Sequence, residues 1–166
     1  MNLNSNPTRF SEEQIGKLIL DSAFKVHTKF GPGLLESVYE SALTIELMKL
    51  ELKVERQKSI PIEYDGHLLE VAFRADLIVN DLVLVKLKSV EAITPLFKKT
   101  VTNYLKLIPL RLGFLINFNE TQFKNGIIRV VNGLEGKSFF KGTNSRLNVD
   151  LANSSPSSRS SRDTQS

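Results

Sequence analysis

Residues 76–88 constrain the fold of this chain more strongly than any other part of the sequence. Residues 82–87 are nearly all leucine or valine, which is typical of a strand that is buried on both faces of a sheet. The pair Asn80-Asp81 separates this run from another apolar run, residues 73–79, and both residue types favour tight turns. We therefore expect two adjacent strands near the centre of a β-sheet.

Signals for helices flank these strands. Ser11 followed by Gln14 forms a capping box, Thr94-Pro95 indicates a further helix start, and Asp65-Gly66 predicts a hairpin turn. Because the antiparallel strands are followed by one strand–helix–strand crossover, this order predicts an α/β fold, with a mixed β-sheet flanked by α-helices. The expected helices cover about residues 11–31, 35–50 and 94–107, and the expected strands cover 54–57, 60–64, 68–73, 73–79, 82–87, 111–118 and, at a sheet edge, 127–131.

The composition is that of one globular domain with terminal extensions. Of the 166 residues, 41% are hydrophobic, which is enough for a core. We expect a flexible N-terminus over residues 1–10, a domain over 11–142 and a disordered tail containing Ser and Arg over 143–166. Because the chain has no cysteine and no long apolar run, we expect a cytoplasmic protein without disulfides, thiolate metal sites or membrane association. The oligomeric state does not follow from the sequence.

Charged residues on the two central strands suggest metal-dependent hydrolysis of a phosphodiester. Asp76 belongs to the first strand, and Lys86 and Lys88 share one face of the second strand because alternate side chains point the same way. Hydrolysis of a phosphodiester with Mg²⁺ needs two or three oxygen ligands on the ion, and a lysine assists by stabilising charge on the phosphate. The segment supplies the aspartate and the lysine, but a second cation stands at position 86.

A series of short motifs on both sides of these strands resembles one protein family. Residues 33–39, Gly-Leu-Leu-Glu-Ser-Val-Tyr, match the Gly-x-x-Glu-x-x-Tyr signature of the GxxExxY protein family, a branch of the PD-(D/E)XK nuclease-like superfamily. The resemblance covers roughly residues 15–131 and implies a restriction-endonuclease-like fold. The other matching motifs are Val26-His27 with Phe30-Gly31-Pro32-Gly33, Arg74-Ala75-Asp76-Leu77, Tyr104-Leu105-Lys106, residues 113–118 and residues 126–129.

The resemblance also implies roles for individual residues. Glu36 corresponds to the acid on the second helix, and Asp76 to the metal-binding aspartate. Lys88 corresponds to the catalytic lysine, and Tyr104 lies on the helix that follows the motif strand. An intact site of this kind implies a Mg²⁺-dependent nuclease acting on DNA or RNA.

Two positions depart from the family pattern. Lys86 replaces a metal-binding glutamate, and Thr100 replaces a helix glutamine. A lysine ammonium about 4 Å from Mg²⁺ repels the ion, and it can pair with Asp76 and fill the site with an internal salt bridge. Our leading hypothesis is therefore a nuclease-like protein with a degenerate, inactive site, which binds metal weakly or not at all and retains nucleic-acid binding. The alternatives are an active nuclease, in which Glu36 and Asp76 hold Mg²⁺ and Lys88 assists the water, and a non-catalytic protein-interaction module.

The basic residues allow two interpretations. They can form a cleft that binds nucleic-acid phosphates, or they can be the solvated face of a helix. The other site residues also have ordinary structural explanations, since Glu36 suits the first turn of a helix, Tyr104 suits a core and Asp76 can be satisfied by a neighbouring cation. The residues of the expected basic cleft are Lys86, Lys88, Lys98, Lys99 and Lys106.

Overall fold

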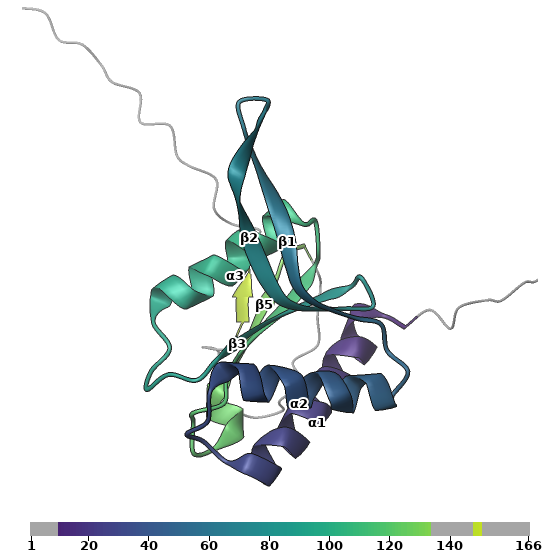
Figure 1. Ribbon diagram of the computed structural model, residues 1–166, viewed down its shortest axis with the longest axis vertical. Coiled ribbons are helices and arrows are strands. Elements are labelled where there is room, and N and C mark those ends of the chain that lie inside the picture. Colours follow the sequence, from purple (N-terminus) through teal and green to yellow (C-terminus); the bar gives the residue numbers. More distant parts are fainter. Residues whose placement is uncertain (1–9, 134–147, 151–166) are drawn as a thin grey trace, which may run out of the picture.

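The protein folds around a six-stranded mixed sheet with the strand order β1-β2-β3-β4-β5-β6. The computed structural model describes residues 10–133 and 148–150. Figure 1 shows helices on both sides of the sheet. The helices are α1 (Glu12–Phe30), α2 (Glu36–Lys49) and α3 (Pro95–Leu107), with the short 3-10 helix η1 (Phe123–Gly126), and the strands are β1 (Val54–Tyr64), β2 (His67–Val79), β3 (Val83–Lys88), β4 (Leu112–Asn117), β5 (Ile127–Val131) and β6 (Asn148–Asp150).

The sheet combines an antiparallel half with a parallel crossover. Strands β1, β2 and β3 pair antiparallel in sequence order. Strand β3 then pairs parallel with β4, and α3 forms the connection between them. Strand β5 pairs antiparallel with β4 and parallel with β6. The predicted α/β fold with a mixed sheet flanked by helices is therefore confirmed.

Two apolar cores lie on opposite faces of the sheet. On one face, α1 and α2 cover residues such as Leu77 and Val85. On the other face, α3 covers residues such as Ile78 and Leu84. Because side chains alternate along a strand, the even-numbered residues at the end of β3, Lys86 among them, point to the face that α3 covers.

The local signals at the helix ends are partly realised. Ser11 forms the predicted capping box with Gln14, and α1 ends at Gly31 with a positive φ of 64° that suits glycine. Thr94 is the N-cap of α3 as predicted, but its side chain makes no capping hydrogen bond. Pro95 is the first residue of α3, where its fixed φ suits the first helical turn.

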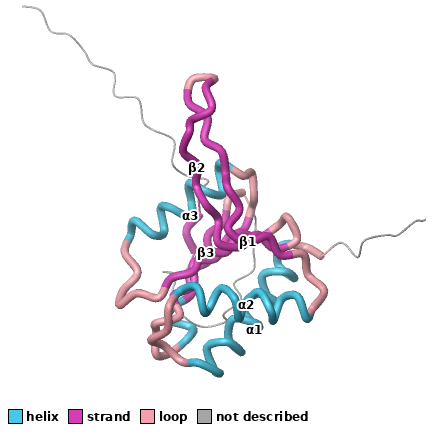
Figure 2. Tube along the Cα trace, viewed as in Figure 1, coloured by secondary structure: helices cyan, strands magenta, loops and turns pink. Residues whose placement is uncertain are grey.

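The first two strands form a long hairpin. The Asp65-Gly66 turn joins them, and both turn residues have positive φ, as this turn type requires. Figure 2 shows the far end of the hairpin extending beyond the helices. The prediction of separate short strands at 54–57, 60–64, 68–73 and 73–79 is wrong here, because β1 and β2 each run through these positions as one strand. Their pairing has a gap at Gln57 and an irregularity between Pro61 and Glu63.

The C-terminal part of the sheet differs from the prediction in one respect. Strand β5 is not an edge strand, because β6 pairs with it from Arg129–Asn148 to Val131–Asp150. Strand β6 lies within the predicted tail, and the remainder of that segment lies outside the described residues, as does the expected flexible N-terminus apart from Phe10. Within the described part of the chain, no helix is long and apolar enough to cross a membrane.

Candidate functional site

Asp76 forms the centre of the candidate site, where β2 and β3 diverge. The ladder between these strands ends at the Leu77–Val85 pair. Asp76 directly precedes this pair and is buried, with 4% of the residue exposed. Its Oδ1 accepts a hydrogen bond from Lys86 Nζ at 2.9 Å, and its Oδ2 accepts one from the Leu87 backbone N–H at 2.7 Å. Both oxygens of the expected metal-binding aspartate are therefore engaged within the protein.

A second acid and a second lysine lie at the same end of the sheet. Glu36 is the first residue of α2, and its Oε2 lies 3.9 Å from Lys88 Nζ at the end of β3. Burial raises the pKa of the Glu36 carboxyl above its ordinary value, attraction to Lys88 offsets part of that rise, and repulsion by Asp76 adds to it. The Lys88 ammonium also lies 4.8 Å from the centre of the Phe97 ring on α3, a cation–π contact.

Two residues of α3 that the family resemblance singled out, Tyr104 and Thr100, make no hydrogen bond to the two carboxylates of the site. Tyr104 is buried, and its ring centre lies 6.0 Å from Lys86 Nζ and 4.7 Å from the Phe73 ring centre. Tyr104 therefore borders the site as a packed residue. Thr100 donates its hydroxyl proton to the Leu96 carbonyl of its own helix at 2.9 Å. That side chain thus hydrogen-bonds locally instead of reaching the carboxylates.

One carboxylate beside the site was not predicted from the sequence. Glu40 lies one helical turn after Glu36 and is 6% exposed. Its two oxygens accept hydrogen bonds from Arg56 Nε at 3.0 Å and from Gln57 Nε2 at 2.6 Å. Glu36 and Glu40 are four positions apart, and this spacing places both acids on the same face of helix α2. The partners on β1 were not predictable from a local pattern, because they lie 16 and 17 positions from Glu40 in the sequence.

A further residue of the Gly-x-x-Glu-x-x-Tyr signature supports the start of α2. The Tyr39 hydroxyl donates to the Gly31 carbonyl at 2.6 Å and accepts from the Leu34 N–H at 3.1 Å. Its ring stacks on Phe118, with 4.5 Å between the ring centres. Tyr39 therefore fixes the turn that brings Glu36 to the end of the sheet.

These side chains do not fit a Mg²⁺ ion. A hard divalent cation takes oxygen ligands, and its protein sites usually present a net negative charge. Here the two acids Glu36 and Asp76 face the two lysines Lys86 and Lys88, so the four formal charges cancel. Among residues 10–133 and 148–150, no group of three acidic or histidine side chains converges in a way that could hold a metal ion.

The lysines of α3 add positive charge next to this neutral cluster. The helix contains Lys98, Lys99 and Lys106 but no acidic residue. No ion pair to these three lysines occurs in the part of the chain that the structure describes. Lys88 contacts Phe97 at the N-terminal end of the same helix, so the basic helix and the candidate site adjoin.

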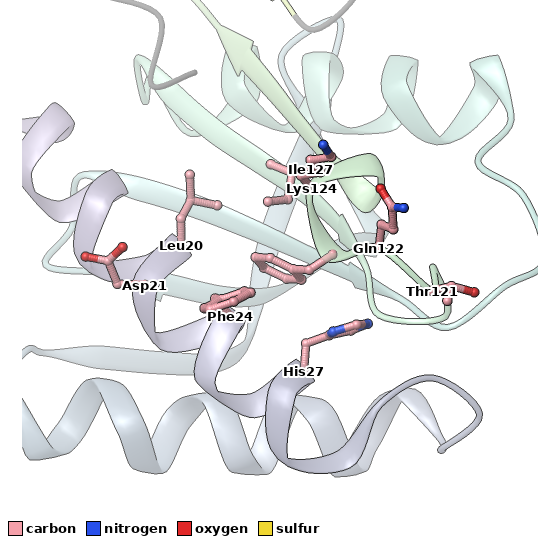
Figure 3. Close-up of a pocket in the computed structure, with 9 residues that line it drawn as sticks. Leu20, Asp21, Phe24, His27, Thr121, Gln122, Lys124 and Ile127 are labelled. Atoms are coloured by element: carbon pink, nitrogen blue, oxygen red, sulfur yellow. The ribbon is translucent and has the colours of Figure 1, made fainter. Parts of the chain in front are cut away.

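A cavity elsewhere in the described structure is a separate feature. It has a volume of about 480 Å³ and lies between α1 and the segment that joins β4 to β5. Figure 3 shows Phe24 and His27 at its wall, and His27 Nε2 lies 2.7 Å from the Glu120 carbonyl oxygen. None of the predicted site residues lines this cavity.

The central strands of this mixed α/β sheet carry an acid and two lysines where they diverge, at the position of the predicted nuclease motif. The chain matches the model of the PD-(D/E)XK nuclease superfamily over residues 13–130, and it belongs to that superfamily. Comparisons with curated proteins and with solved structures give no match. The predicted superfamily is thus confirmed, whereas membership of the GxxExxY branch stays a prediction.

Proposed function

We propose that this protein binds nucleic acid without cleaving it, as a GxxExxY-type member of its superfamily with a degenerate metal site. The observation that supports this most directly is the 2.9 Å ion pair between Lys86 Nζ and Asp76 Oδ1. The ammonium occupies the side of Asp76 that a metal ion would need. Asp76 Oδ2 is engaged as well, by the Leu87 N–H.

Electrostatics opposes entry of a metal ion into this arrangement. Two unit charges at about 4 Å interact by roughly 4 kcal/mol at an effective dielectric constant of 20, so a divalent ion beside Lys86 meets roughly twice that repulsion. The side chains of Lys86 and Asp76 are 16% and 6% exposed, so water screens the pair only partly. Metal binding would therefore require Lys86 to leave its position.

The charge distribution favours phosphate binding instead. Because the charges of the four site residues cancel, the lysines of α3 determine the net charge of this face. Lys99 and Lys106 are exposed and Lys98 is half-buried, so all three ammonium groups have access to solvent. Lysines that neutralise phosphates release condensed counterions, which provides affinity that falls as salt rises.

Binding assays on the full chain test this proposal. Fluorescence anisotropy with labelled single- and double-stranded DNA and RNA gives the affinity at several salt concentrations. The affinity falls as salt rises, and replacing Lys98, Lys99 and Lys106 by alanine should make this dependence shallower. On duplex DNA the slope of log K against log salt should become less negative by up to about 2.7, which is about 0.9 for each lost phosphate contact. As a control, Lys17→Ala on α1 removes one exposed lysine that pairs with Asp21, and it should leave the slope unchanged.

Cleavage assays distinguish the rival function, an active Mg²⁺-dependent nuclease that uses Glu36, Asp76 and Lys88. One observation favours that rival, since Asp76 raises the pKa of Glu36 and the two carboxylates are therefore close enough to interact. We expect no cleavage of DNA or RNA with Mg²⁺ or Mn²⁺. Metal-dependent cleavage that disappears in Asp76→Ala would overturn the proposal.

A further inference from the structure

The cavity of about 480 Å³ beside α1 has the size and the lining of a small-molecule site. Such sites are usually clefts of about 300–1,000 Å³ with mostly apolar walls and a few polar groups that fix the orientation of the ligand. The apolar wall here consists of Leu20, Phe24, Phe123 and Ile127. Figure 3 shows Leu20 and Phe24 on α1, across from Thr121 and Ile127. The cavity therefore suits an apolar ring system that makes a small number of hydrogen bonds.

One polar side chain at this cavity is buried and has a hydrogen-bonding atom without a partner. His27 lines the cavity and is only 8% exposed. Its Nε2 lies 2.7 Å from the Glu120 carbonyl oxygen, and because a carbonyl oxygen only accepts, Nε2 carries the ring proton. The other nitrogen of the neutral ring, Nδ1, is then an acceptor. Within the described part of the chain no group donates to Nδ1, and this atom is not fully enclosed. His27 thus presents an unused acceptor at the cavity wall.

Two phenylalanine rings frame this acceptor. The Phe123 ring centre lies 5.4 Å from the His27 ring centre and 5.7 Å from the Phe24 ring centre. Phe123 is buried, whereas 56% of Phe24 is accessible. Phe24 and His27 are three positions apart on α1 and therefore share one face of the helix. An aromatic ligand can stack on Phe24 beside His27, and the hydrogen bond to Glu120 holds the imidazole in place for it.

We propose that this cavity binds a neutral, planar heteroaromatic molecule whose ring N–H donates a hydrogen bond to His27 Nδ1. The charged residues of the lining favour a neutral ligand, because the formal charges of Asp21 and Lys124 cancel. Asp21 is also engaged by Lys17 at 2.6 Å. The cavity lies on the side of the sheet that α1 covers, whereas α3 covers the opposite face. This inference therefore does not depend on nucleic-acid binding by the α3 lysines.

Titrations of the full chain with indole and with benzofuran, followed by ¹H–¹⁵N NMR, test this site. The two molecules share one ring frame, but only indole carries an N–H. We expect indole to cause saturable shifts at amides of the lining, Phe24 and Thr121 among them, with a Kd of about 1 mM or below. Benzofuran should bind about 5-fold more weakly, because it leaves the Nδ1 acceptor without a donor. The titrations are run near pH 8, where imidazole side chains are ordinarily neutral.

Three variants connect the preference for indole to the cavity. His27→Gln keeps an N–H for the Glu120 carbonyl but has no acceptor at the position of Nδ1, so it should bind indole and benzofuran equally. His67→Gln is the matched control, because it changes the other histidine of the chain, which is exposed beside the hairpin turn, and it should keep the preference. Phe24→Ala changes an exposed side chain and should weaken both ligands by a similar factor, because both lose the same stacking contact.

The outcomes separate the site from its proposed acceptor. Absence of saturable shifts with indole up to about 10 mM, or equal affinity of the wild-type protein for the two ligands, overturns the proposal. Affinities that are unchanged in Phe24→Ala overturn the placement of the ligand in this cavity. A preference for indole that persists in folded His27→Gln overturns the role of His27 Nδ1.

Discussion

Replacing Lys86 by glutamate is the most informative single change in the candidate site. Lys86→Glu removes the 2.9 Å ion pair with Asp76 and places a second carboxylate beside it. Breaking a buried ion pair costs about 3 kcal/mol at the lower end of the observed range, and the low exposure of both side chains supports a value of this size. At about 3 °C per kcal/mol for a domain of this size, the melting temperature should fall by roughly 9 °C without metal.

Metal ions should restore most of that loss. Two carboxylates on adjacent strands supply the oxygen ligands that Mg²⁺ and Mn²⁺ prefer. At a free metal concentration about 100 times the dissociation constant, binding stabilises the folded state by about 2.7 kcal/mol, or roughly 8 °C in the melting temperature. The wild-type protein, in which Lys86 fills the site, should show no comparable shift.

Thermal melts in EDTA and in millimolar Mn²⁺ measure these shifts. Lys86→Gln is the matched control, because it removes the cation without adding a ligand. It should lose a similar amount of stability and recover none with metal. A gain of several degrees by wild-type protein with the metal, or rescue of Lys86→Gln as complete as that of Lys86→Glu, would show that Lys86 does not block a metal site.

Three further predictions concern the surroundings of the site. Because burial raises the pKa of Glu36 above its ordinary 4.5, the folded state holds this proton more tightly than the unfolded state. Ionised Glu36 therefore costs stability above the raised pKa, and this cost vanishes as pH falls below 4.5. Near neutral pH, Glu36→Gln should thus melt at a higher temperature than wild type. The gain in the free energy of unfolding should be less than about 1 kcal/mol, because the Glu36 side chain is 40% exposed. Near pH 3.5 the two proteins should melt at the same temperature. Tyr39→Phe loses the 2.6 Å hydrogen bond to the Gly31 carbonyl and should reduce the urea-derived free energy of unfolding by about 1–2 kcal/mol. Gly126→Ala would place a methyl group 2.2 Å from the Asn117 carbonyl oxygen and should cost about 2 kcal/mol or more in the same assay.

The sequence by itself determined the three helices, the central strand pair and the order of these elements along the chain. The capping box at Ser11, the turn at Asp65-Gly66 and the apolar run of β3 are short-range signals, because each depends on residues a few positions apart. They sufficed for the α/β fold, and the motifs sufficed for the superfamily. The central strand pair with Asp76 and Lys86 also followed from alternation along the strands.

The tertiary structure decided what each side chain contacts. The sequence allowed Asp76 several cationic partners, and only the divergence of β2 from β3 selects Lys86 and the Leu87 N–H. The buried Glu40 gained its partners from β1, whose residues lie far from it in the sequence and approach α2 only in the folded chain. Strand β5 became internal because β6, from a segment distant in sequence, pairs with it. Periodicity shows which face of an element is apolar, but partners from distant segments decide whether that face is covered and whether a charge is neutralised.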